Sequence, residues 1–228
     1  MDAEAIAKAA PRQVLADHAY DVLVELLVDG RLEAGSAINI DGLARSMEIS
    51  RTPIREALAR LEATSLIRRT ALKGYRVAPL PSTEELLELM DARLVIEPVN
   101  ASLACARNSE SLVQQLQESV DTMAKAPRGA VFAEFREYLQ ADERFHFLIS
   151  SGAGNRYLLS AYTALGGQAQ RFRLFAGRGV TDAAQAIDEH SQIVRAFAEG
   201  DPAGAQAAMT RHLERARART VEESLSTS

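Results

Sequence analysis

Residues 50–58 read SRTPIREAL, and the fold predicted for the first third of the chain rests mainly on these nine residues. Ile54, Leu58 and Leu61 recur at i, i+4 and i+7, which predicts a helix with one buried apolar side. Pro53 fits only the first turn of a helix, where its missing N–H leaves no bond unmade, so the helix begins at the start of this stretch. Its first turn therefore combines arginines and hydroxyls with an apolar side that is buried.

The polar side of this predicted helix suits a DNA major groove. Arg51, Thr52 and Arg55 lie on or near that side, and Ser50 precedes them. Arginine can bind guanine edges with two hydrogen bonds, while hydroxyls and backbone N–H groups bind phosphates. The alternative is an ordinary amphipathic surface helix with an arginine-rich face, so the neighbouring sequence has to decide.

The preceding sequence predicts the rest of a helix-turn-helix. Residues 40–47 indicate a short helix that Asn39 or Asp41 could cap. Residues 48–49 then form a tight turn into the arginine-rich helix, an arrangement typical of DNA-binding proteins. Residues 12–29 predict a longer amphipathic helix ahead of both, which makes three helices in all.

The following sequence predicts a β-hairpin wing. Residues 66–69 and 71–77 indicate two short strands around a tip that contains glycine. Lys73, Gly74 and Arg76 lie at or near this tip, where they can contact the DNA backbone or minor groove. The predicted domain is thus a winged helix-turn-helix.

The charge distribution favours the same function. Residues 45–76 hold eight basic and three acidic residues, whereas the whole chain has a formal net charge of −5. Positive charge is therefore concentrated on one segment of an acidic protein, which is typical of a DNA-binding module attached to a body with another role.

These motifs resemble the winged helix-turn-helix of the GntR family of bacterial transcription regulators. The resemblance covers roughly residues 12–78 and rests on residues 32–35, 43–44, 50–58, 60–61 and 74–77. Three features depart from the family pattern. Thr64-Ser65 replaces the usual Glu-Gly, Gly42 lies inside the first short helix, and Asp41 stands where the family often has a polar or basic residue for DNA contact. These departures bear on sequence preference more than on fold.

The length of 228 residues accommodates two domains. We expect the DNA-binding domain in residues 1–78, a proline-containing linker in 79–83, and a second domain in 84–228. The chain has one cysteine, which excludes an intrachain disulfide, and no apolar run of about 18 residues that could cross a membrane. With no signal peptide at the N-terminus, these features favour a cytoplasmic location.

The second domain is predicted to be entirely helical. Turn signals rich in glycine and proline separate its helical patterns, which span residues 83–106, 111–125, 130–151, 154–176, 182–199 and 202–222. The fold class is therefore mainly α, with an N-terminal winged helix-turn-helix followed by an all-α antiparallel bundle of about six helices.

Three of the four histidines can meet in this bundle. Asp142 and His146 are four residues apart on one helix face, so their side chains point the same way. His190 and His212 each lie eleven residues from Asp201, so an antiparallel hairpin sets them at similar height. One carboxylate and three imidazoles suit a divalent metal, Zn²⁺ first among Zn²⁺, Ni²⁺, Mn²⁺ and Fe²⁺. The alternative is that these histidines serve as hydrogen-bonding residues of the core.

Residues 84–222 resemble the FCD-type ligand-binding domain of the FadR subfamily. The matching features are Met90 to Pro98, Asp142 with His146, Glu189-His190 with Ile193, and His212. The resemblance implies that Asp142, His146, His190 and His212 hold a divalent metal in a buried cavity. It also implies that Arg93 points into that cavity and binds the carboxylate of a small organic acid. The alternative for Arg93 is a salt bridge to Glu97 or Asp91.

Together these features predict a homodimeric, metabolite-responsive transcription regulator. It would read a short inverted repeat in double-stranded DNA and respond to a small carboxylate effector, as a repressor if it follows most of the family. We expect no catalysis, because no general base or nucleophile motif accompanies the predicted metal site. A regulator that responds to the metal alone and a metal-dependent enzyme fused to a DNA-binding domain are the alternatives.

Overall fold

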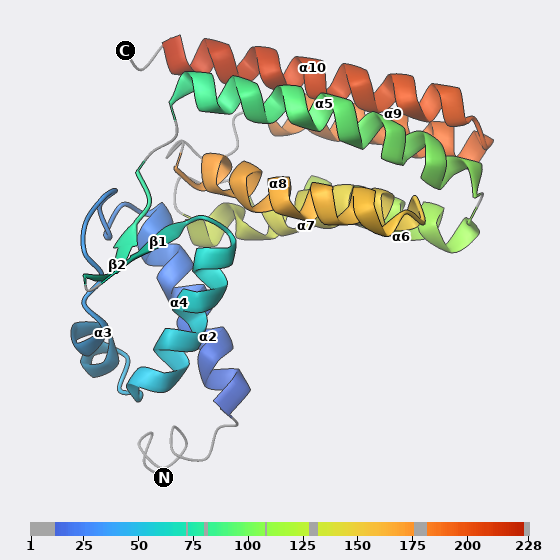
Figure 1. The fold of residues 1–228 in the computed structure, drawn as a ribbon. Coiled ribbons are helices and arrows are strands. Elements are labelled where there is room, and N and C mark those ends of the chain that lie inside the picture. Colours follow the sequence, from blue (N-terminus) through green and yellow to red (C-terminus); the bar gives the residue numbers. More distant parts are fainter. Residues whose placement is uncertain are drawn as a thin grey trace. The chain divides into compact units, whose positions relative to one another are not determined.

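The computed structural model describes residues 12–71, 73–79, 82–107, 109–127, 132–175 and 182–225. The chain forms two compact units, the first built mainly on residues before 81 and the second on residues after it. The helices and strands of both units are labelled in Figure 1. Within the described residues, no helix is long and apolar enough to cross a membrane.

The first unit is a winged helix-turn-helix, as the sequence predicts. Its elements are α2 (Arg12–Val28), α3 (Ile40–Ser46), α4 (Arg51–Ala63), β1 (Ile67–Thr70) and β2 (Gly74–Val77). The two strands pair antiparallel, with Ile67 opposite Val77 and Thr70 opposite Gly74, which forms the wing. Helix α4 is the arginine-rich helix, and it begins directly after Ser50.

The apolar side of α4 packs against α2 in this unit. Ile54, Leu58 and Leu61 are fully buried, which confirms the side that their spacing predicts. Leu23 and Leu27 of α2 are buried with them. Burying a leucine or isoleucine stabilises the fold by about 1.5–3 kcal/mol, so this seam holds the position of α4.

The start of α3 explains why glycine stands at position 42. The side chain of Asn39 accepts a hydrogen bond from the Gly42 backbone N–H at 2.9 Å and so caps the helix. A Cβ atom at position 42 would lie 2.9 Å from Asn39 Nδ2, closer than such contacts normally come. Glycine at 42 therefore leaves room for this cap.

Two residues of the first unit adopt a backbone conformation that favours glycine. Glu48, in the turn between α3 and α4, has φ of 55°, and Ser65, after α4, has φ of 59°. A side chain in this left-handed region costs roughly 1–2 kcal/mol. Ser65 stands where the resembling family usually has the glycine of its Glu-Gly pair. The chain therefore makes the same turn with a serine, which bears the cost of the left-handed conformation.

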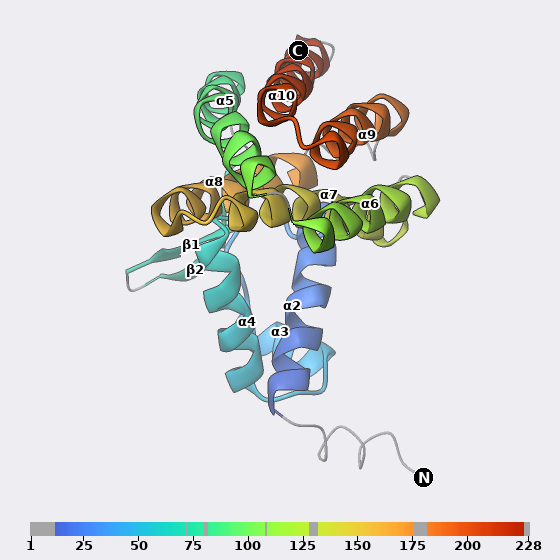
Figure 2. The same cartoon turned by 90° about the vertical axis from the view of Figure 1, so that its right-hand side faces the viewer.

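The second unit is an all-helical bundle. Its helices are α5 (Thr83–Ala106), α6 (Glu110–Lys125), α7 (Phe132–Gly152), α8 (Arg156–Phe175), α9 (Ala183–Glu199) and α10 (Pro202–Leu225). Figures 1 and 2 show two layers, with α5, α10 and α9 in one and α8, α7 and α6 in the other. The boundaries agree closely with the helices predicted from the turn signals.

Specific contacts set the directions of these helices. Ser82 caps α5 in a capping box with Glu85, which confirms the predicted start. Helices α9 and α10 form an antiparallel hairpin through a left-handed Gly200. Across the layers, α5 and α7 run in the same direction, because residue 97 meets residue 146 and residue 100 meets residue 150.

Candidate metal centre and nucleic-acid interface

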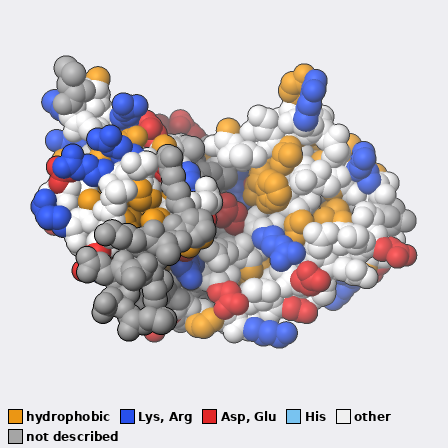
Figure 3. Space-filling view, turned by 90° about the horizontal axis from the view of Figure 1, so that it is seen from below, with side chains coloured by type: hydrophobic (Ala, Val, Ile, Leu, Met, Phe, Trp, Pro, Cys, Tyr) orange, Lys and Arg blue, Asp and Glu red, His pale blue; other side chains and the backbone are white. Residues whose placement is uncertain are grey.

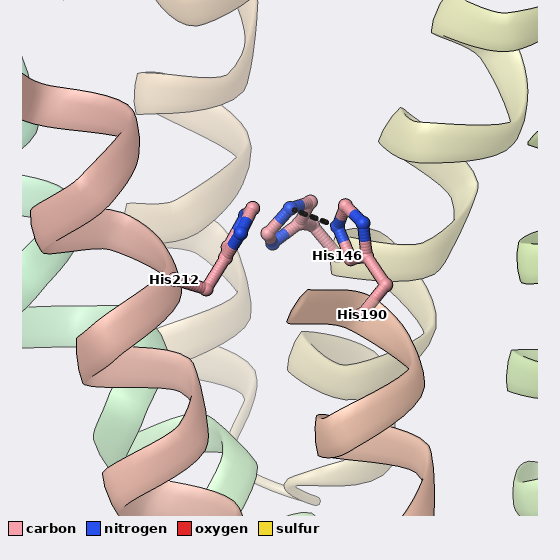
Figure 4. Close-up of side chains that lie close together, drawn as sticks. All are labelled: His146, His190 and His212. Atoms are coloured by element: carbon pink, nitrogen blue, oxygen red, sulfur yellow. Dashed lines mark hydrogen bonds between the residues drawn. The ribbon is translucent and has the colours of Figure 1, made fainter. Parts of the chain in front are cut away.

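Three imidazoles converge between the two layers of the bundle. His146 projects from α7, His190 from α9 and His212 from α10, and each is at most 2 % exposed. One ring nitrogen of each lies within 4.8 Å of the others. Figure 4 shows the three rings turned toward one another, with Nε2 of His146 and Nε2 of His190 3.3 Å apart.

The α9–α10 hairpin places two of these histidines at the same height. The ring centroids of His190 and His212 are 4.4 Å apart, although 22 positions separate the two residues in the sequence. Their equal spacing from Asp201 predicts this proximity, and the structure confirms it. The third histidine, His146, comes from the other layer, so the cluster depends on how the layers pack.

Asp142 lies beside the cluster, one turn before His146 on α7. It is 2 % exposed, and its Oδ1 is 3.5 Å from Nε2 of His190. Among the described residues, the group whose ligand atoms all lie within 4.8 Å of one another consists of the three histidines. Asp142 is therefore adjacent to this group and within reach of it.

Two buried glutamates orient the histidines from outside. Nδ1 of His146 lies 2.6 Å from Oε2 of Glu97, and Nδ1 of His212 lies 2.8 Å from Oε2 of Glu189. A metal-binding histidine normally directs its other ring nitrogen to such a carboxylate, which sets the tautomer and the ring orientation. Nε2 of both rings is left facing the cluster.

Glu97 is shared between His146 and Arg93. Nε of Arg93 donates to Oε1 of Glu97 at 2.5 Å, and Arg93 is 6 % exposed. Burial alone would raise the pKa of the Glu97 carboxyl, but the Arg93 charge and the partnership with His146 hold that pKa well below its usual range. Arg93 thus makes the salt bridge to Glu97 that the sequence left as the alternative.

Glu189 has a parallel arrangement. Arg219 donates from both terminal nitrogens to its carboxylate, at 2.9 and 3.1 Å. Burial would raise the pKa of Glu189, but the hydrogen bonds from His212 and Arg219 lower it to about 2. The sequence indicates Glu97 only as an alternative partner of Arg93, and it does not predict that Glu189 or Arg219 orients a histidine. The signals that could have found them are the i, i+4 spacing of Arg93 and Glu97, the adjacency of Glu189 to His190, and the position of Arg219 two turns after His212.

The chemistry of the cluster fits a divalent metal. Nε2 of His212 is buried and has no hydrogen-bond partner among the described residues. Burial lowers the pKa of His212, which favours the neutral imidazole that binds metal ions. A buried ring nitrogen without a partner is costly, and a metal ion at the centre of the cluster would satisfy it.

Tyr162 is a further buried polar residue of the bundle that the sequence did not indicate. It comes from α8 and is 7 % exposed. Burial raises the pKa of its phenol, and the negative charge of Glu97 raises it further. The hydroxyl therefore stays protonated and can donate a hydrogen bond.

The predicted DNA-contacting residues of α4 lie on the surface of the first unit. Ser50, Arg51, Thr52 and Arg55 are all exposed. Ser50 is the N-cap residue of α4, yet its side chain makes no capping hydrogen bond. Its hydroxyl is therefore not occupied in holding the helix end.

The wing residues are exposed as well. Lys73 lies in the turn between the strands, and Gly74 has φ of +79°, which glycine adopts without strain. Arg76 donates from Nη1 to the Gly35 carbonyl oxygen at 2.7 Å, so part of its role is to hold the wing to the domain. Figure 3 shows many Lys and Arg side chains over the winged helix-turn-helix (on the left), as the local charge predicts.

Both units of the chain match known protein families. Residues 15–77 match the bacterial regulatory proteins of the gntR family, and residues 88–215 match the FCD domain. The chain belongs to the GntR family of transcription regulators, with an FCD domain at its C-terminal side. Its families and relatives are regulators and not enzymes, which confirms that expectation.

Curated relatives cover most of the chain. It is 29 % identical over 210 residues to a probable D-xylose utilization operon transcriptional repressor of Paenarthrobacter nicotinovorans, covering 92 % of this chain and 90 % of that protein. It is 28 % identical over 199 residues to the HTH-type transcriptional repressor GlaR of Escherichia coli (strain K12), covering 85 % and 90 %. The chain is thus a GntR-family transcriptional regulator with repressors among its relatives.

Solved structures support the fold. E. coli McbR/YncC matches with a TM-score of 0.69 at 18 % identity, over 91 % of this chain and 97 % of that one. A putative GntR regulator from Rhodococcus sp. RHA1 matches with a TM-score of 0.65 at 19 % identity, over the same shares of the two chains. At this identity the likeness shows the fold alone.

Proposed function

We propose that this GntR-family regulator is a homodimeric repressor whose affinity for its operator is controlled by a small organic acid bound at a divalent metal. The observation that carries the proposal is the buried cluster of His146, His190 and His212, whose ring nitrogens lie within 4.8 Å of one another. Two buried carboxylates outside the cluster support it: Glu189 is hydrogen-bonded to Nδ1 of His212, and Glu97 lies in ion-pair contact with Nδ1 of His146, as is usual for metal-binding histidines.

The three histidines would hold the metal, with Asp142 as the fourth ligand. Three nitrogens and one oxygen favour Zn²⁺, and they also accommodate Ni²⁺, Mn²⁺ or Fe²⁺. When bound, the ion supplies a positive charge and coordination positions for an anionic ligand. The residues of the chain orient the imidazoles and exclude water from them.

Arg93 is the proposed contact for the effector carboxylate. Nε and Nη2 of its buried guanidinium donate to Glu97, the carboxylate that also meets the metal ligand His146. An effector carboxylate would bind the N–H groups that Glu97 leaves. A planar fork of N–H donors binds carboxylates in two-point contacts, which a lysine does not reproduce. Relatives named as repressors of a D-xylose utilization operon and of a gluconate operon support a small polar metabolite as the effector class.

The first unit would read one half-site of a short inverted repeat in double-stranded DNA. Arg51, Thr52 and Arg55 would enter the major groove and Ser50 would bind phosphate, while Lys73, Gly74 and Arg76 would contact the backbone or minor groove. The proposed division is residues 1–78 for this domain, 79–83 for the linker and 84–228 for the metal, effector and dimerisation domain. Because DNA is the partner, the proposed location is the cytoplasm.

A homodimer follows from the need to read two half-sites. Helix α5 offers an exposed apolar stripe that supports it, since Val95, Val99 and Leu103 are four residues apart and 72 %, 40 % and 40 % exposed. An effector that binds one arrangement of the two DNA-binding domains more tightly than another shifts operator affinity, typically by about 1–3 kcal/mol.

Metal analysis with a matched control tests the proposal. Elemental analysis and native mass spectrometry on the purified protein should find about one divalent ion per chain. The ion should be lost in His190→Ala and retained in His18→Ala, which removes the exposed histidine of α2. Wild-type protein that takes up no divalent ion on titration would reduce these histidines to packing residues.

The effector is tested by operator binding at saturating metal. Candidate small carboxylates should change operator affinity in the wild type and lose that effect in Arg93→Lys, which keeps the charge but not the fork. Metal that changes operator affinity without any acid would favour a regulator that responds to the metal alone. Turnover of the acid by metal-loaded protein would favour a metal-dependent enzyme fused to a DNA-binding domain.

A further inference from the structure

An exposed ion pair joins the two helices of the helix-turn-helix. Oδ1 of Asp41, in the first turn of α3, lies 2.7 Å from Nε of Arg51, the first residue of α4. The two side chains are 52 % and 63 % exposed. They lie on the lining of a shallow hollow between the helices, formed by Asp41, Ala44, Arg45, Ile49, Ser50 and Arg51.

The pair leaves the recognition surface of Arg51 available. A guanidinium has five N–H donors in a rigid plane, and the Asp41 carboxylate lies 2.7 Å from Nε in an ion pair. The contacts of the described residues give Arg51 no other partner, so its two terminal nitrogens remain available. These are the donors that can bind O6 and N7 of guanine together.

The pair also changes what Arg51 contributes to affinity. An arginine without a partner attracts every phosphate, whereas a carboxylate beside the arginine offsets part of that attraction. An unpaired aspartate on this surface would repel DNA of any sequence. Pairing the two lowers non-specific attraction and keeps the directional hydrogen bonds, which raises the ratio of specific to non-specific binding.

We propose that Asp41 is a specificity-determining residue of this regulator, and that it orients Arg51 toward a guanine base in each half-site. Asp41 acts through Arg51 and is a positioning residue. The inference rests on the proposed function, in which the start of α4 enters the major groove. It gives a role to the aspartate that departs from the family's polar or basic residue at this position.

The same helix offers a matched control. Nη1 of Arg60, near the end of α4, lies 2.6 Å from Oδ1 of Asp17, and these side chains are 46 % and 52 % exposed. Asp17→Asn therefore removes the same charge from an exposed ion pair of the same kind, away from the first turn of α4. Asp41→Asn keeps the shape of the side chain and removes only its charge.

The test begins with selection of binding sites from randomised duplex DNA by the wild-type protein. Dissociation constants are then measured for the selected duplex, for duplexes with each guanine replaced, and for an unrelated duplex. In Asp41→Asn, discrimination at one guanine should fall about tenfold, within the range of a two-point arginine contact, while affinity for the unrelated duplex stays equal or rises. Asp17→Asn should leave discrimination unchanged.

A second background separates positioning from simple repulsion. In Arg51→Lys, which has no planar fork, Asp41→Asn should no longer change discrimination at that guanine. If Asp41→Asn instead raises affinity for every duplex by the same factor in both backgrounds, Asp41 only repels phosphate and the inference is wrong. A folded wild-type protein that selects no sequence overturns the proposed function, and the inference with it.

Discussion

The two units of this protein use the same kinds of ion pair in opposite surroundings. In the winged helix-turn-helix, Asp41–Arg51 and Asp17–Arg60 are about half exposed. In the bundle, Arg93–Glu97 is 7 % and 2 % exposed. Exposed pairs contribute little to stability because water and salt screen them, whereas a buried pair that loses one partner leaves an uncompensated charge. The bundle also has exposed pairs, such as Arg144–Glu118, but Arg93–Glu97 lies in its interior, where loss of one partner is costly.

The largest expected effect is therefore on folding, from Glu97→Ala. This change leaves Arg93 charged and buried and removes the partner of His146 Nδ1, so the free energy of unfolding should fall by about 3–5 kcal/mol. Urea denaturation measures it. Asp17→Ala, which breaks an exposed pair, should cost less than about 1 kcal/mol. Equal losses in the two variants would contradict the comparison.

The next effect is the removal of the metal from the purified protein. Dialysis against a chelator should lower the stability of the bundle by about 2.7–4.1 kcal/mol, if the ion is present at 100 to 1,000 times its dissociation constant. Thermal unfolding before and after dialysis measures this, and return of the ion should restore it. His212→Ala should not respond to the chelator, because the ring whose Nε2 faces the cluster is gone. If the chelator lowers the stability of the wild type and of His212→Ala equally, the result counts against the metal centre.

A smaller effect is expected on DNA binding, where the exposed arginines act. Arg55→Ala should cost about 1–3 kcal/mol of affinity for the selected site and relax base preference at one position. Fluorescence anisotropy with the selected and altered duplexes measures both. Lys73→Ala is the matched control in the wing, and it should weaken all duplexes alike and reduce the salt slope by about 1. Folding stability should change little in either variant, since both side chains are exposed.

The smallest effect concerns backbone strain. Among the described residues, the non-glycine residues with positive φ are Glu48 and Ser65, both in the first unit. Ser65→Gly should stabilise that unit by up to about 1 kcal/mol, because glycine adopts φ of 59° without the Cβ cost but loses more chain entropy on folding. Ala153→Gly, at a buried alanine of the bundle, should instead destabilise. A destabilised Ser65→Gly would mean that the serine side chain has a role that outweighs its strain.

Local sequence determined the winged helix-turn-helix and most of the helix boundaries. The i, i+4, i+7 spacing of Ile54, Leu58 and Leu61 is enough to predict which side of α4 is buried, and Ser82 with Glu85 is enough to start α5, because both features act within two or three turns of one helix. The equal distances of His190 and His212 from Asp201 also predicted their meeting, since a helical hairpin converts sequence spacing into height.

The surroundings of the histidines and of Arg51 depend on how the helices pack against one another. Glu97 meets His146 and Glu189 meets His212 across different helices, and Asp41 meets Arg51 across a turn that needs Glu48 in a left-handed conformation. Such contacts depend on the packing angle and relative rotation of helices, which arise from many weak contacts spread over each interface. Sequence spacing along one helix therefore identified the candidate ligands, while the packing of helices against one another selected the partners that orient them.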